Sequence, residues 1–421
     1  MNLEAGQQGE KALVASPAEA RPVALGLLQR PFLSIWALRG LSVLGTQLIA
    51  FALSLELYQT TGSVLYLGLL GLIQFVPGIC FALPAGHLID RFPPGRVAAI
   101  AQVVNALAGL ILLVPTVMGS PVTAAALFAA ALITGFTRAF EHPVNTALIP
   151  LVVAPEHVGA TVAWTMSVAK VAGLGGPLLA GVLYAITPQL SFGVAVVLWL
   201  AAAVAALSLP APARRPAHQP LGLKSAFAGF AVIWRDRVLG GAMVLDLVAV
   251  LFGGATALLP AVALDLLHVD AVGLGILRAA PGLGAVALGI WLARHPVSRN
   301  SGSVLIGATL VFGLLTCAFG LSRSFVLSSL LLAGIGAADM VSIHIRSALV
   351  QLRTPPELRG RVGAVNGIFI SSSNQIGAFE SGVTADLLGL VPAIVLGGAV
   401  TTAAVLVIAA RFASLRQLRS Y

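Results

Sequence analysis

Charged residues are scarce in this sequence: Lys, Arg, Asp and Glu together make up 9% of its 421 residues. A water-soluble protein of this size carries about 25% charged residues to cover its surface. Hydrophobic residues instead make up 58% of the chain, and the mean hydropathy is +0.99. These values exclude a protein whose whole surface faces water, and they predict one whose outer surface faces lipid.

Cysteines and the common catalytic motifs are also rare or missing. Cys80 and Cys317 both lie inside apolar runs, which favours isolated thiols over a disulfide or a metal site. The sequence contains no G-x-x-x-x-G-K-[ST] loop for nucleotide phosphates and no H-E-x-x-H pair for zinc. We therefore expect no cofactor, no resident metal and no enzymatic activity.

Long apolar runs dominate what is present. Membrane barrels alternate apolar and polar residues, whereas these runs are continuous and about 20 residues long, as a spanning helix requires. Helices also satisfy the backbone hydrogen bonds that lipid cannot. We predict an all-α integral membrane protein with twelve transmembrane helices, at roughly 32–58, 65–86, 97–117, 122–145, 158–185, 190–210, 238–265, 270–293, 302–321, 325–350, 362–386 and 391–412.

The longest polar gap divides these segments into two sets of six. The linker at 211–237 contains Gly222–Trp234, a stretch typical of an amphipathic helix at a membrane surface. The predicted divisions are a disordered tail, a first six-helix bundle, the linker, a second six-helix bundle and a short tail, at 1–30, 31–210, 211–237, 238–412 and 413–421.

Matches between the two halves indicate an internal repeat. At an offset of 201, Ala147-Leu148, Pro155-Glu156, Gly176 and Gly181-Val182 correspond to Ala348-Leu349, Pro356-Glu357, Gly377 and Gly382-Val383. At an offset of 204, Gly71, Pro77 and Gly78 correspond to Gly275, Pro281 and Gly282. Two parallel six-helix repeats are the plan of a secondary transporter that rocks around a central site.

The positions of Lys and Arg predict the orientation. If the N-terminus is cytoplasmic, the cytoplasmic tails and loops hold 18 of the 24 Lys and Arg residues, and the outer loops hold Arg323 alone. This asymmetry is a strong positive-inside signal. The high pI then reflects topology and contact with anionic lipid, so we expect no nucleic-acid partner. We predict a multi-pass protein of the bacterial inner membrane, monomeric, with both termini in the cytoplasm.

The loop after the second segment reads Gly86-His87-Leu88-Ile89-Asp90-Arg91-Phe92-Pro93-Pro94-Gly95-Arg96. It resembles the loop signature G-x-x-x-D-R-x-x-R-R/K of the major facilitator superfamily, from which it departs at Phe92–Gly95. The resemblance implies two pseudo-symmetric six-helix bundles and a conformational latch between them. The latch residues would be Gly86, Asp90, Arg91 and Arg96, together with Arg138 in the fourth segment.

Other stretches resemble the drug and siderophore exporters of this superfamily, the branch that contains the enterobactin exporter and the macrolide efflux proteins. They include Gly275–Pro281, Gln351–Arg361 and Ser371–Gln375. This resemblance implies export of a small molecule in exchange for protons. The exporter-like helix bend falls in the fifth segment, at Gly173, Gly176, Pro177 and Gly181. A metabolite uptake symporter is the alternative, and a membrane sensor or enzyme would require a larger extramembrane domain or a catalytic cluster.

Charges inside apolar segments are costly, at about 2.5–3.5 kcal/mol each, and are therefore expected to be functional or paired. A proton carrier must be a carboxylate whose surroundings change with the access state. The candidates are Asp246, which ranks first, and Asp339, Glu141 and Glu380. A structural pair of Asp246 with Arg346 is the alternative, and Glu141 shares a helix face with Arg138.

Cations and amides within the segments are candidates for the substrate cavity. They are Arg39, Lys170, Arg278, Arg346, Asn374 and Gln375. The cations would favour anionic or zwitterionic substrates. Each is alternatively the fixed partner of a carboxylate.

Overall fold

The computed structural model describes residues 30–209, 230–231, 233–295, 300–355 and 358–418. Within these ranges the chain is helical and contains no strand. The predicted tail at 1–30, apart from Arg30, and most of the amphipathic stretch Gly222–Trp234 lie outside the described residues.

The described part of the first half forms seven α-helices. They are α1 (Arg30–Thr61), α2 (Val64–Cys80), α3 (Ala82–Arg91), α4 (Pro94–Val117), α5 (Ala124–Val152), α6 (Val158–Ile186) and α7 (Pro188–Leu207). The second predicted segment, 65–86, is interrupted at Phe81, four residues after Pro77. Pro84 lies four residues after Cys80, and proline cannot donate to the carbonyl of the residue four positions before it and clashes with that carbonyl, which explains why α2 ends there.

The second half forms α9 (Arg237–Phe252), α10 (Leu259–Ala261), α11 (Ala271–Arg294), α12 (Ser301–Leu321), α13 (Phe325–Arg353), α14 (Arg359–Leu388), α15 (Leu390–Arg411) and α16 (Ala413–Arg416). The predicted segment 238–265 is broken at Gly253-Gly254 and continues as the short turns η3 (Ala255–Leu258), α10 and η4 (Val262–Leu266). A Cβ on Gly254 would lie 2.8 Å from the carbonyl oxygen of Gly377, so the break accompanies close packing against α14.

Ten of the described helical stretches are long and apolar enough to cross a membrane, and α2 is a shorter apolar helix. The helix α14 falls outside those ten because it carries the polar run Ser371–Asn374. Large apolar side chains cover the outside: Leu107, Val117 and Val204 are 53%, 67% and 68% exposed. Such a surface fits lipid, so the chain is a multi-pass membrane protein.

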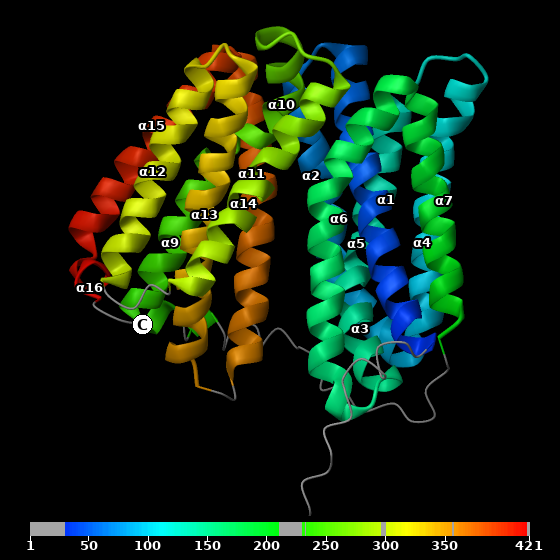
Figure 1. Ribbon diagram of the computed structural model, residues 1–421, viewed down its shortest axis with the longest axis horizontal. Helices are drawn as coiled ribbons and strands as arrows, with labels where there is room; N and C mark the ends of the chain where they lie inside the picture. The colour runs from blue at the N-terminus through cyan, green and yellow to red at the C-terminus, as the bar shows by residue number, and fades with distance from the viewer. Residues whose placement is uncertain (1–29, 210–229, 232, 296–299, 356–357, 419–421) are drawn as a thin grey trace, which may run out of the picture.

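Helices α1–α7 pack among themselves, as do α9–α16, and the two groups lie side by side (Figure 1). The larger contacts between the groups join α2 to α14 and α6 to α11. We call the groups the N half and the C half. The helix α16 follows α15 within the predicted C-terminal tail. Gly302 at the start of α12 donates its N–H to the Leu418 carbonyl at 3.2 Å, and this bond holds the tail against α12.

The connections divide the molecule into two sides. One, the short-loop side, carries the turns at 62–63, 118–123, 187, 267–270, 322–324 and 389. The other, the linker side, carries the end of α7, the start of α9 and α16 (Figure 1).

Glycines form both seams between the halves. A Cβ on Gly382 of α14 would lie 2.8 Å from the Cα of Gly68 in α2, and one on Gly181 of α6 would lie 3.2 Å from the Cα of Gly275 in α11. Both approaches lie toward the short-loop ends of their helices. Gly181 and Gly382 are the pair that the sequence repeat matches at an offset of 201, so the repeat corresponds to two equivalent seams.

Candidate functional site

The deepest charged pair lies within the C half. Asp246 on α9 forms an ion pair with Arg346 on α13, and the two residues are 7% and 4% exposed. The sequence offered Asp246 as a proton carrier and this pair as the alternative. Because both partners belong to the same half, relative movement of the halves leaves the pair intact.

A second pair occupies the equivalent helices of the N half. Arg39 on α1 lies 3.6 Å from Glu141 on α5. Glu141 therefore pairs with Arg39 and not with Arg138, which lies one turn away on α5 and is exposed. Arg138 and Glu141 are three residues apart and so share one face of α5, but the cation paired with Glu141 comes from another helix. A small pocket adjoins this pair, where Gln102 donates to Ser42 Oγ at 2.9 Å and its own buried Oε1 lacks a partner among the described residues.

Lys170 and Asp339 come from opposite halves. Lys170 is exposed on α6, and Asp339 is half-buried on α13. Their charges interact electrostatically, although neither belongs to an ion pair within 4 Å in the described part of the chain. This is a carboxylate whose cationic neighbour belongs to the other half, in contrast to Asp246.

Arg278 lies in the contact between the halves rather than in open space. From α11 it donates to Ser54 Oγ at 2.5 Å and to the Ala50 carbonyl at 3.4 Å, and its guanidinium lies 5.3 Å from the centre of the Phe51 ring. The sequence offered Arg278 as a substrate-cavity residue. In this arrangement it joins α11 to α1 on the short-loop side.

A neighbouring contact between the halves was not predicted from the sequence. The hydroxyl of Tyr58 on α1 donates to the Asp265 carboxylate in η4, so it also joins the two halves near the short loops. Each residue sits at the end of an apolar segment, where polar side chains usually face water, and nothing in either local pattern points to the other.

The predicted latch is described in part. Arg91 at the end of α3 and Arg96 in the first turn of α4 are exposed, and Gly86 lies within α3 with open space where a Cβ would be. The Asp90 side chain lies outside what the structure describes. The latch therefore stays a prediction.

The polar face of α14 lies along the seam with α2. The Oε1 of Gln375 is 2.9 Å from the position of a Cβ on Gly71, and Asn374 is exposed and donates to the Ile370 carbonyl at 2.8 Å. Closer to the short loops, Glu380 accepts a hydrogen bond from Thr384 Oγ1 at 2.9 Å.

The Gly-Pro stretch of α6 contacts both α1 and α11. The carbonyl of Gly173 accepts a hydrogen bond from Gln47 Nε2 at 3.1 Å, and a Cβ on Gly176 would lie 2.5 Å from Gln47 Cβ. On the other side, the Pro177 carbonyl is 2.7 Å from the position of a Cβ on Gly275. The small residues thus let α6 fit between two neighbours.

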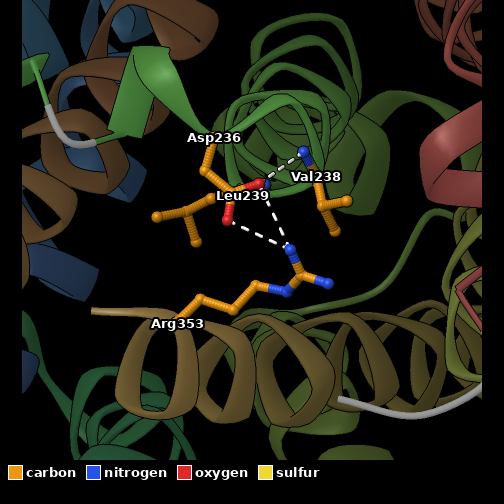
Figure 2. Close-up of polar contacts among 4 residues, drawn as sticks. All are labelled: Asp236, Val238, Leu239 and Arg353. Carbon is orange, nitrogen blue, oxygen red and sulfur yellow. Dashed lines mark hydrogen bonds and ion pairs between the residues drawn. The ribbon is translucent and has the colours of Figure 1, made fainter. Parts of the chain in front are cut away.

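One further ion pair, not predicted from the sequence, lies on the linker side. Figure 2 shows Asp236 before α9 accepting hydrogen bonds from the N–H of Val238 at 2.8 Å and of Leu239 at 3.2 Å, while Arg353 at the end of α13 lies 3.1 Å away. Burial alone would raise the pKa of Asp236, but these hydrogen bonds and the guanidinium charge together hold it below its ordinary value.

Among the described residues, no group of three or more His, Cys, Asp or Glu side chains could hold a metal ion. Cys80 and Cys317 are both free thiols.

Two curated relatives span most of the chain. It is 26% identical over 372 residues to the enterobactin exporter EntS of Shigella dysenteriae serotype 1, covering 87% of this chain and 84% of that protein. It is 24% identical over 370 residues to macrolide efflux protein A of Streptococcus pyogenes, covering 85% of this chain and 90% of that protein.

Solved structures share the fold. A bacterial homologue of the iron transporter ferroportin matches with a TM-score of 0.67 and 18% identity, covering 93% of this chain and 99% of that one. A bacterial homologue of the human lysosomal transporter Spinster matches with a TM-score of 0.68 and 14% identity, covering 94% of this chain and 97% of that one.

The sequence profile of the Major Facilitator Superfamily matches residues 35–379. That span includes the seam between α6 and α11 and the ion pairs Arg39–Glu141 and Asp246–Arg346, and the relatives are transporters and not enzymes. By its sequence and its fold, this chain belongs to the Major Facilitator Superfamily of transporters.

Proposed function

We propose that this transporter exports a small molecule, a drug-like compound or a siderophore, across the bacterial inner membrane in exchange for protons. Two curated relatives are an enterobactin exporter and a macrolide efflux protein, which favours export over uptake. The observation that carries the proposal is the pair Lys170 and Asp339, one charge from each half, placed where movement of the halves changes their separation.

The linker side is proposed to face the cytoplasm, because it carries nearly all the loop Lys and Arg residues. The close approaches between the halves described above lie toward the short loops. The arrangement therefore corresponds to a state that is closed toward the outside, and export requires the halves to part at the short loops and meet at the linker side.

Asp339 is the proposed proton carrier. The proton affinity of a carboxylate depends on its burial and on its distance from neighbouring charges. Lys170 faces Asp339 from α6, His344 and Arg346 lie further along α13, and α11 contributes Arg278. Of these groups, Lys170 is the one that belongs to the half opposite Asp339, and in the described part of the chain neither Lys170 nor Asp339 is held in an ion pair. Asp246 keeps the same partner throughout and is assigned a structural role.

Proteoliposomes that contain a pH-sensitive dye test the direction of coupling. A substrate is first identified by a thermal-shift screen of drugs and siderophores with the purified protein, and it is then added outside the vesicles. Exchange for protons makes the lumen more alkaline as substrate enters, whereas an uptake symporter makes it more acidic. This sign is the same for either orientation of the protein in the vesicle.

Asp339→Asn should abolish the substrate-driven proton flux while substrate exchange between the two sides of the vesicle continues. The amide keeps the size and polarity of the side chain but cannot ionise. A proton flux in Asp339→Asn equal to that of the unaltered protein would assign the carrier elsewhere, with Glu141 and Glu380 the next candidates.

A further inference from the structure

The seam between α6 and α11 ends close to Lys170. A Cβ on Gly275 would lie 2.7 Å from the Pro177 carbonyl, and a Cβ on Gly282 would lie 2.7 Å from Leu174 Cδ1. Lys170 is one turn beyond Leu174 on the same face of α6, toward the linker side. Its side chain is exposed.

Asp339 lies near the same level on α13, the helix that packs against α11. The helix α11 is packed tightly on α13, where a Cβ on Gly336 would lie 1.9 Å from the Pro281 carbonyl. Asp339 follows Gly336 by three residues and Lys170 precedes Leu174 by four, each toward the linker side. At 1.5 Å per residue, Lys170 lies about 6 Å beyond its contact with α11 and Asp339 about 4.5 Å beyond the Gly336–Pro281 contact, both toward the linker side.

The other seam ends at the same kind of position with neutral polar groups. Gly71 of α2 meets the Gln375 side chain, and the next residue of α14 toward the linker side, Asn374, is exposed. Both seams therefore carry polar side chains on the linker side of the glycine contacts described. Amides bind neutral and charged groups alike, so the charge preference at this level depends on Lys170 and Asp339.

We infer that Lys170 is the anchor for an anionic group of the exported molecule, a carboxylate, sulfonate or phosphate, and that Asp339 competes with this group for the same ammonium. The inference rests on the proposed transport function and adds the chemical class of the substrate. Lysine binds such anions as a compact charge with three donors. An ammonium that is exposed, and has no carboxylate within 4 Å in the described part of the chain, is available to a ligand.

Competition predicts opposite effects for the two charges. Removing the ammonium weakens anion binding, whereas removing the Asp339 charge strengthens it, because a repelling neighbour is lost. Arg278 adds positive charge nearby, toward the short loops, where it donates one hydrogen bond each to Ser54 and Ala50. A cationic substrate would reverse both effects.

Two dyes that differ by one group test the inference in lipid nanodiscs. Both 8-anilinonaphthalene-1-sulfonate and N-phenyl-1-naphthylamine have the same aromatic skeleton, and the first alone carries a sulfonate. Fluorescence titrations, corrected with empty nanodiscs, give the dissociation constant of each dye. We expect Lys170→Gln to weaken sulfonate binding at least tenfold and to leave the neutral dye within twofold.

Three further variants separate charge from fold. Lys170→Arg should keep sulfonate binding within about threefold, and Asp339→Asn should strengthen it several-fold without changing the neutral dye. Arg411→Gln, at the exposed end of α15, removes a positive charge of the linker side and should change neither dye. Equal binding of the sulfonate by Lys170→Gln and the unaltered protein overturns the inference, as does an equal loss of both dyes or weaker sulfonate binding in Asp339→Asn.

The binding assay and the proton-flux assay test different proposals, so one proposal can be overturned without the other. A selective loss of sulfonate binding in Lys170→Gln supports the anion site even where the vesicles show no proton flux, and that result would overturn the coupling proposal alone. Proton-coupled export with unchanged sulfonate binding in Lys170→Gln would overturn the anion site alone.

Discussion

Gly181→Ala is expected to open the transporter on its short-loop side. The added Cβ would lie 2.6 Å from the Ala271 carbonyl oxygen and 3.2 Å from the Cα of Gly275, both backbone atoms of the opposite half. Overpacking of this kind costs about 1–3 kcal/mol. Alanine also favours the helix by about 1 kcal/mol, but α6 is helical in either state, so this gain cancels in the conformational equilibrium.

The steric cost therefore falls on the state that is closed at the short loops. At 1.4 kcal/mol for each factor of ten, the ratio of open to closed molecules should rise by roughly 5- to 150-fold. Gly175→Ala is the matched control, because its Cβ would meet nothing within 4 Å on the same helix. That variant gains the helix propensity and should leave the ratio unchanged.

Pulsed electron paramagnetic resonance measures this ratio directly. Spin labels at Ser120 in the N half and Leu388 in the C half, both exposed beside the short loops, report the separation of the halves after Cys80 and Cys317 are replaced by Ala. A longer-distance population should grow in Gly181→Ala. An unchanged distance distribution, or the same change in Gly175→Ala, would refute the idea that the glycine seam sets the equilibrium.

Two further predictions concern the ion pairs within the C half. Arg346→Met should destabilise the fold by about 3–5 kcal/mol because it strands a buried carboxylate, and adding Asp246→Leu should recover most of that loss in thermal unfolding; a double variant as unstable as the single one would contradict a structural pair. Asp236→Asn keeps the helix cap and removes the charge, so it should cost about 0.2–1 kcal/mol, whereas Asp236→Ala loses about 1 kcal/mol more with the cap. The pKa of Asp236 is lower in the folded protein than in the unfolded chain, so its charge stabilises the fold fully above about pH 4. The cost of Asp236→Asn should therefore vanish as the pH falls through the folded pKa. Urea unfolding measured at a series of pH values tests this.

The positions of the helices follow from composition alone, but their interruptions do not. A run of about twenty apolar residues has few alternatives to a spanning helix in lipid. The predicted segments therefore lie close to the helices observed. The break at Gly253-Gly254 depends on the approach of Gly377 from α14, a contact between distant parts of the chain. No local pattern carries that information.

Pairing of charges shows the same limit within the site. Glu141 shares a helix face with Arg138, yet Arg39 from α1 is its neighbour, because helix packing brings a cation from outside the local sequence. The repeat, by contrast, identified Gly181 and Gly382 correctly as equivalent positions, since close backbone approach leaves glycine as the residue that fits. Positions of close backbone approach can therefore be predicted from the sequence more readily than the partners of charged side chains.

The distribution of strong and weak contacts explains how such a protein can move as two bodies. Within each half, one ion pair ties the first spanning helix to the fourth: Arg39 to Glu141 in the N half, and Asp246 to Arg346, with the charges exchanged, in the C half. The contacts described between the halves are glycine seams and individual hydrogen bonds, such as that from Tyr58 to Asp265. Rocking of the halves therefore breaks none of the three ion pairs described, and the energy needed is limited to seam packing and a few hydrogen bonds. This range is small enough for the charge on a substrate, or on a single carboxylate, to reverse the balance.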